Sequence, residues 1–122
     1  GPYILYTIVR IKSILNKYQA QGKSLEGLVI ESAHNESEKA LMLEVAKYNE
    51  VMETAYEELA PHKVCAYIYD VANAFNRFYH ETKILSEENE ARQKSYLALL
   101  ILAKKVLEAC IDVLGFEAPE RM

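Results

Sequence analysis

Two aromatic rings and one guanidinium are spaced so that they could bind unpaired bases and a phosphate. Tyr3, Tyr6 and Arg10 stand at positions i, i+3 and i+7 of an apolar-periodic segment, so a helix would project them from one side. Aromatic rings stack on splayed bases, and an arginine beside them can hold the phosphate backbone. The alternative is that the tyrosines are amphipathic core residues, with the arginine stem lying along them.

Other reactive side chains lack the partners that their chemistry requires. His62 and Cys65 are three residues apart on an expected helix, but two ligands do not make a metal site and no second pair follows. Glu31 and His34 form one Glu-x-x-His motif, of which a di-iron bundle uses two. The sequence contains no glycine-rich phosphate loop, nucleophile elbow or paired acids. We therefore predict no catalytic residue and no metal ligand in this chain.

Charge is distributed unevenly along the 122 residues, which carry a formal net charge of -4. Residues 1–25 contain four basic side chains and no acid, whereas residues 26–60 contain nine acids and two lysines. The acidic total argues against non-specific binding to DNA duplexes, which depends on dense lysine and arginine contacts. The acidic middle is interpreted as a helix face in water.

The composition favours one all-helical domain in a reducing compartment. Four glycines and three prolines are too few for the many tight turns of a sandwich or barrel. No apolar run approaches the roughly 20 residues of a membrane span, and no signal-peptide pattern opens the chain. Two cysteines do not make a disulfide framework, so we expect a cytoplasmic protein without a membrane partner.

Apolar residues at three- and four-residue steps predict the helices that would position these side chains. The first helix is expected from Tyr3 to about Lys17, followed by a break at residues 22–27. Asn35 and Glu38 have the spacing of a capping box. Helical segments at 36–47 and 49–59 follow, the second with Leu59 on its apolar face, and they form either one helix or two joined at a kink.

Two longer helices are expected in the second half of the chain. Pro61 suits a first helical turn, and the pattern continues to about Tyr79, with the polar side chains assigned to water: Asp70, Asn73 and Asn76. Ser86 is the expected N-cap of the last helix. Its apolar face includes Leu102 and Cys110, and Gly115 is its expected left-handed C-cap, with Phe116 making the accompanying contact. Four or five helices with short connections predict an all-α helix bundle.

Three blocks of sequence resemble the C-terminal domain of bacterial-type arginyl-tRNA synthetases, in order and with matching spacing. Gly1–Ile14 is similar to the helix that begins this domain, Pro61–Tyr79 to its central helix, and Val106–Met122 to its terminus, which ends in methionine. The blocks cover most of the chain outside residues 20–60. The resemblance identifies the chain as an all-helical anticodon-binding domain of the DALR type, spanning residues 1–122.

This resemblance implies a binding module within a larger ligase. The family joins arginine to its tRNA with ATP and Mg²⁺, through the signatures His-Ile-Gly-His and Lys-Met-Ser-Lys-Ser, and neither occurs here. The chain also begins inside a family motif without an initiator methionine, which is expected of a fragment. The implied partners are the anticodon loop of tRNA(Arg) and the catalytic domain of the same polypeptide, and no cofactor is expected in the fragment itself.

The resemblance also assigns residues to the tRNA contact. By motif, the anticodon-binding residues would be Tyr3, Tyr6, Arg10, Tyr79 and Met122. One departure is Gln93, where the family usually has leucine, and it bears on how the start of the last helix packs. The competing interpretation is a helical protein-interaction module that contacts its partner through the glutamate-rich middle and does not bind RNA.

Overall fold

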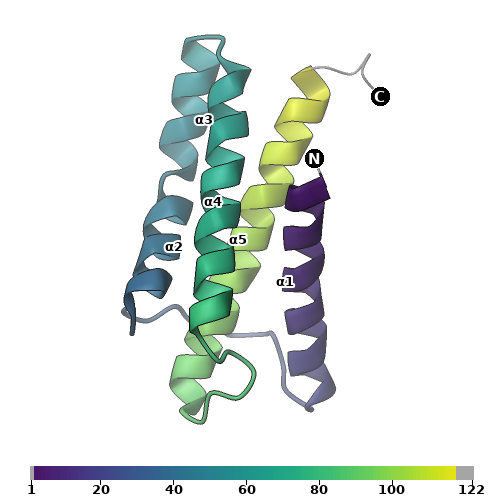
Figure 1. Cartoon of the computed structure of the whole chain (residues 1–122), viewed down its shortest axis with the longest axis vertical. Coiled ribbons are helices and arrows are strands. Elements are labelled where there is room, and N and C mark those ends of the chain that lie inside the picture. The colour runs from purple at the N-terminus through teal and green to yellow at the C-terminus, as the bar shows by residue number, and fades with distance from the viewer. Residues whose placement is uncertain (1, 118–122) are drawn as a thin grey trace.

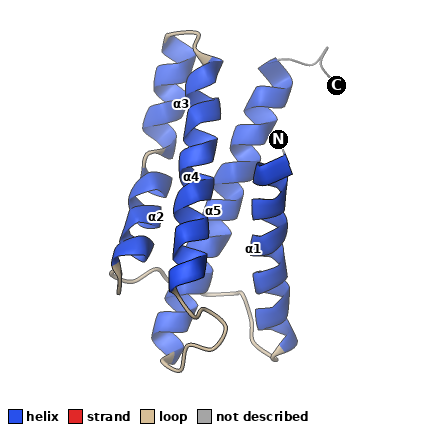
Figure 2. Cartoon of the chain, in the orientation of Figure 1, coloured by secondary structure: helices blue, strands red, loops and turns tan. Residues whose placement is uncertain are grey.

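A computed structural model of the chain describes residues 2–117, and within them the chain forms five helices and no strand (Figures 1 and 2). The all-α prediction is therefore confirmed. The helices are α1 (Pro2–Ala20), α2 (Glu36–Ala46), α3 (Tyr48–Glu57), α4 (Pro61–Glu81) and α5 (Glu90–Glu117).

Helix α4 is the centre of the bundle. It lies between α1 and the α2–α3 pair, with α5 behind it (Figure 1), and it contacts all four of the other helices. Its buried face follows the helical spacing expected from the sequence, from Val64 through Val71 to Phe78. The predicted stripe of α1 is also buried, at Ile4, Ile8, Ile11 and Leu15. Burial of these aliphatic side chains is the main favourable term in the folding of such a bundle.

The start of α2 confirms the predicted cap, with one difference in its geometry. Asn35 Oδ1 accepts a hydrogen bond from the backbone N–H of Glu38 at 2.7 Å, as an N-cap should. In a capping box the Glu38 side chain would return to the N–H of Asn35. Instead, the buried Glu38 carboxylate accepts from the N–H of His34 at 2.6 Å, one residue earlier.

The acidic middle forms two helices joined at a kink rather than one continuous helix. Helix α2 ends before Lys47, and α3 begins after it. The Tyr67 hydroxyl of α4 donates to the carbonyl of Glu44 at 2.6 Å, which satisfies a backbone acceptor at the end of α2. Burial raises the pKa of Tyr67 well above its usual value, so this hydroxyl keeps its proton.

The prediction that Leu59 lies on the buried face of α3 is wrong. Helix α3 ends at Glu57, and Leu59 sits in the turn before α4 with φ 51°, in the left-handed region. Its side chain is 86% exposed as a result. Leu102, also assigned to an apolar core face, is 39% exposed on α5.

The expected caps of α5 are corrected at both ends. Ser86 is not the N-cap, because α5 begins at Glu90 and Asn89 Oδ1 accepts from the N–H of Arg92 at 3.0 Å. Gly115 is not a left-handed cap, because the helix continues through it to Glu117 and its φ is not positive. The expected contact of the Phe116 side chain lies outside what the structure describes.

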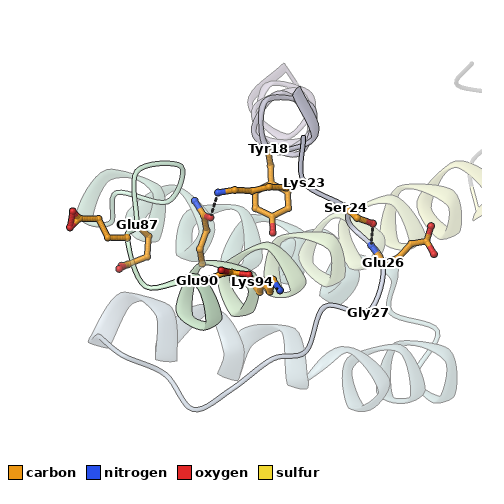
Figure 3. Close-up of a pocket in the computed structure, with 10 residues that line it drawn as sticks. Tyr18, Lys23, Ser24, Glu26, Gly27, Glu87, Glu90 and Lys94 are labelled. Carbon is orange, nitrogen blue, oxygen red and sulfur yellow. Dashed lines mark hydrogen bonds and ion pairs between the residues drawn. The ribbon is translucent and has the colours of Figure 1, made fainter. Parts of the chain in front are cut away.

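Gln93 explains why the chain before α5 turns where it does. Its buried amide nitrogen, Nε2, donates to the carbonyls of Ile84 and Leu85, both at 3.1 Å, and Lys23 Nζ donates to its Oε1 at 2.7 Å. Figure 3 draws the bond from Lys23, which lies in the α1–α2 connection, as a dashed line. An amide at this position therefore ties two connections to α5, which a leucine could not do.

Within residues 2–117, no helix has the length and apolar character that are needed to cross a membrane.

We predict that Asn35→Ala lowers the free energy of unfolding by about 1–2 kcal/mol, because it removes the cap of α2. The substitution also removes the hydrogen bond from Asn35 Nδ2 to Thr82 Oγ1. Urea unfolding of the two proteins measures the difference. Asn16→Ala, at an exposed position inside α1, is the matched control and should leave stability unchanged or slightly raised. Equal effects at both positions would contradict the capping role.

The two thiols should differ strongly in reactivity. Cys65 is exposed, whereas Cys110 is buried in the core as expected, and burial raises the pKa of its thiol to about 11. At pH 8 we expect a thiol reagent to modify Cys65 rapidly and Cys110 only after unfolding. Mass spectrometry of native and urea-unfolded protein counts the modified thiols. Rapid native labelling of a Cys65→Ser variant would disprove the burial of Cys110.

Candidate nucleic-acid interface

The side of the bundle between α1 and α4 gathers exposed tyrosines around one arginine. We call it the tyrosine face, and its members are Tyr3, Tyr6 and Arg10 of α1 and Tyr69, Asn73, Asn76 and Tyr79 of α4. Tyr3 is 39% exposed, Tyr6 73% and Tyr79 36%. The alternative that these tyrosines belong to the core is therefore wrong. Core tyrosines do occur in this chain, at Tyr18, Tyr67 and Tyr96.

The Asn76 side chain joins the two helices of the tyrosine face. Its Oδ1 accepts from Arg10 Nη1 at 2.7 Å, and its Nδ2 donates to the Tyr3 hydroxyl at 3.0 Å and to Thr7 Oγ1 at 3.1 Å. The Tyr3 hydroxyl in turn donates to Asn73 Oδ1 at 2.6 Å. These bonds hold the ring of Tyr3 and the guanidinium of Arg10 in place before any ligand arrives.

Aromatic contacts fix two more rings of this face. Tyr3 and Tyr69 lie parallel, with ring centroids 6.0 Å apart and an interplanar angle of 6°. The Arg10 guanidinium carbon lies 4.5 Å from the centroid of the Tyr79 ring, a cation–π contact. The guanidinium thus has one bond to Asn76 and one face on Tyr79. Its remaining donors can bind an anion from solvent, since an arginine offers five N–H groups.

Of the five residues assigned from the sequence, the structure brings three together. Tyr3, Arg10 and Tyr79 form one contact set, and Tyr6 lies at its solvent edge on the same stripe of α1. Met122 lies outside the described residues.

Sequence reasoning missed Tyr69, Asn73 and Asn76 as members of this face. The two asparagines were assigned to water, and Asn73 is indeed exposed, but it also accepts a hydrogen bond from Tyr3, while the partly buried Asn76 accepts one from Arg10. The available signal was their spacing, because residues 69, 73 and 76 stand at i, i+4 and i+7 on the helix that also carries Tyr79. That spacing is similar to the spacing of the stripe on α1. The sequence alone does not show that these two stripes contact each other.

A hollow of about 420 Å³ adjoins Tyr79 at the C-terminal end of α4. Its lining includes Ile14, Gln21, Thr82, Lys83 and Ser86. A separate polar hollow of about 410 Å³, drawn in Figure 3, lies between the α1–α2 connection and the start of α5. Its walls contain four glutamates together with Lys23 and Lys94, and Lys94 pairs with Glu90 at 3.1 Å.

Within residues 2–117, no three metal-ligating side chains are grouped closely enough to hold a metal ion.

Comparisons with known proteins agree on one family. A family model described as the DALR anticodon binding domain matches residues 4–122. The chain is 65% identical to an arginine–tRNA ligase of Agathobacter rectalis and 47% identical to one of Alkaliphilus oremlandii, in each case over the whole chain and 21% of the relative. It is 37% identical to an arginine–tRNA ligase of Francisella tularensis, over the whole chain and 22% of the relative. The chain thus spans about a fifth of the length of the curated relatives it matches.

We predict that Asn76→Ala lowers the free energy of unfolding by about 1–3 kcal/mol, because Arg10, Tyr3 and Thr7 all lose a partner at once. Asn73→Ala is the matched control, since Asn73 is exposed and accepts one bond from Tyr3. It should cost less than half as much in the same urea titration. Similar losses for the two variants would contradict the central place given to Asn76.

Proposed function

The chain belongs to the family of DALR anticodon binding domains, and we propose that its tyrosine face binds the anticodon loop of tRNA(Arg). In this proposal residues 1–122 are a single C-terminal domain of a cytoplasmic arginine–tRNA ligase. The parent enzyme would join arginine to its tRNA with ATP and Mg²⁺, using a catalytic domain of the same polypeptide. The present chain contributes recognition and no bond-making step.

The observation that carries this proposal is the set of exposed rings around an ordered arginine. A single-stranded loop is recognised by splaying its bases, stacking them on aromatic side chains and bonding their edges. Tyr6 is the most exposed of the three assigned rings and has an open face for stacking. Arg10 is anchored by Asn76 and Tyr79, so its remaining N–H groups can bind a phosphate or a base edge without first being ordered.

The charge distribution favours an RNA contact at α1 over one at the α2–α3 side of the bundle. All four charged residues of the first 25 are basic, and Arg10, Lys12 and Lys17 lie on α1 itself. The nine acids of residues 26–60 belong to α2, α3 and their connections. Phosphate is therefore attracted to α1 and repelled by the α2–α3 side. Met122 is proposed to complete the RNA contact, as the family motif implies.

The names of the relatives support this function rather than a protein-binding module without RNA contact.

We expect Tyr6→Ala in the full-length ligase to weaken tRNA(Arg) binding by about 1–3 kcal/mol, roughly 5- to 150-fold, because a stacking ring is lost. Tyr6→Phe keeps the ring and should bind almost as well as the unchanged enzyme. Filter binding or fluorescence anisotropy at a fixed salt concentration measures the dissociation constant. ATP and arginine affinities should not change in either variant.

Arg10→Ala should weaken tRNA(Arg) binding in the same assay, since a phosphate or base-edge contact is lost. Lys39→Ala, which removes an exposed positive charge from α2, is the charge-matched control and should bind normally. If Tyr6→Ala and Arg10→Ala both bind tRNA with unchanged affinity, the assignment of the tyrosine face is rejected.

A further inference from the structure

Tyr69 adds a ring to the tyrosine face that neither the spacing on α1 nor the family resemblance assigned to the RNA contact. Its ring lies parallel to that of Tyr3, with the centroids 6.0 Å apart and an interplanar angle of 6°. That distance falls within the roughly 4.5–7 Å of offset stacked aromatic rings, which cover each other only in part. Tyr69 is 38% exposed and Tyr3 39%, so solvent reaches both rings. We call these two residues the Tyr3–Tyr69 pair.

The Tyr3–Tyr69 pair is held in place from both of its helices. One ring comes from α1 and the other from α4, and these helices lie side by side (Figure 1). The Tyr3 hydroxyl donates to Asn73 Oδ1 at 2.6 Å and accepts from Asn76 Nδ2 at 3.0 Å. A base that stacks here therefore meets a ring that is already ordered, which lowers the entropy lost on binding.

The Tyr3–Tyr69 pair lies at one end of the tyrosine face, and the contact between Arg10 and Tyr79 lies at the other. Tyr69 and Tyr79 are ten residues apart on α4, which is about 15 Å at 1.5 Å per residue. That separation is several times the roughly 3.4 Å step between stacked nucleotides of one strand. Different nucleotides of a bound loop would therefore meet the two ends.

The charges at the two ends differ as well. The Arg10 guanidinium lies over the Tyr79 ring, so that end can bind a phosphate. The residue that follows Tyr69 on α4 is Asp70, which is exposed. An acid beside the ring disfavours a phosphate, whereas stacking on a ring does not require positive charge. The Tyr69 end therefore suits the face of a base.

We propose that the Tyr3–Tyr69 pair is a second stacking position for an unpaired base of the anticodon loop, separate from the position at Arg10 and Tyr79. The domain then contacts at least two loop bases through aromatic rings, and Tyr69 is a binding residue. This inference rests on the proposed function, because it requires the tyrosine face to bind RNA.

The test uses the full-length ligase with tRNA(Arg) that carries one 2-aminopurine, placed in turn at each unpaired position of the anticodon loop. Stacking quenches the fluorescence of 2-aminopurine, so the quenching in the complex reports which base is stacked. All complexes are measured at saturating enzyme. We expect Tyr69→Leu to remove the quenching at one loop position and Tyr79→Leu to remove it at a different one. Loss at the same position in both variants, or at no position in Tyr69→Leu, overturns the proposal.

The affinity for tRNA(Arg) separates stacking on Tyr69 from a purely structural role. Tyr69→Leu should raise the dissociation constant roughly 5- to 150-fold, and Tyr69→Phe, which keeps the ring, should restore it to within about twofold. Tyr56→Leu is the matched control and should bind normally, because Tyr56 is 84% exposed on α3, outside the tyrosine face. Equal dissociation constants for Tyr69→Leu and Tyr56→Leu, or weak binding by Tyr69→Phe, would show that the ring of Tyr69 does not stack on a base.

Tyr6→Ala and Arg10→Ala distinguish a failure of this inference from a failure of the proposed function. If these two variants bind tRNA(Arg) weakly while Tyr69→Leu binds like the unchanged enzyme, the second stacking position is wrong and the proposed function stands. If none of the three substitutions changes the affinity, the tyrosine face is not the RNA contact and both are wrong.

Discussion

The tyrosine face depends on one amide, that of Asn76, because it fixes α1 against α4. The aliphatic stripes of the two helices bury against the same core, but such contacts are non-directional and tolerate sliding. The hydrogen bonds from Asn76 to Tyr3 and Thr7, and from Arg10 to Asn76, are directional. They set one register between the helices, so the Tyr3 hydroxyl and the Arg10 guanidinium share one partner on α4, and the guanidinium lies over the Tyr79 ring. The geometry of the tyrosine face therefore follows from hydrogen bonds that also join two helices of the fold.

Sequence patterns predicted the presence of the helices better than the residues at which they end or the contacts between them. Aliphatic spacing placed the core of α1 and α4, since burial repeats every three to four residues. Caps depend on single polar residues, and both Ser86 and Asn89 have suitable chemistry. The chain selects Asn89 because Gln93, itself buried, holds the carbonyls of Ile84 and Leu85 in the connection before it. Such a choice rests on tertiary contacts that local periodicity does not contain.

The division of the tyrosines likewise needed both levels of information. Spacing put Tyr3, Tyr6 and Arg10 on one stripe, and the family resemblance added Tyr79, but neither showed which rings face solvent. The structure buries Tyr18, Tyr67 and Tyr96 and leaves the tyrosine face exposed. It also shows that Asn76 is partly buried and that both Asn76 and the exposed Asn73 are partners of Tyr3. When each helix is considered alone, a polar stripe is predicted to face solvent. Its contact with a polar stripe on another helix becomes visible only in the structure.

A net charge of -4 is compatible with an RNA partner when attraction and repulsion are assigned to different sides of the bundle. At physiological ionic strength exposed charges act over roughly 8 Å, so a phosphate near α1 responds mainly to the basic residues there. Stacking adds affinity that does not require positive charge. If a base binds at the tyrosine face as proposed, Asn76 already holds Arg10 and Tyr3, and the side chain left to be ordered is chiefly Tyr6.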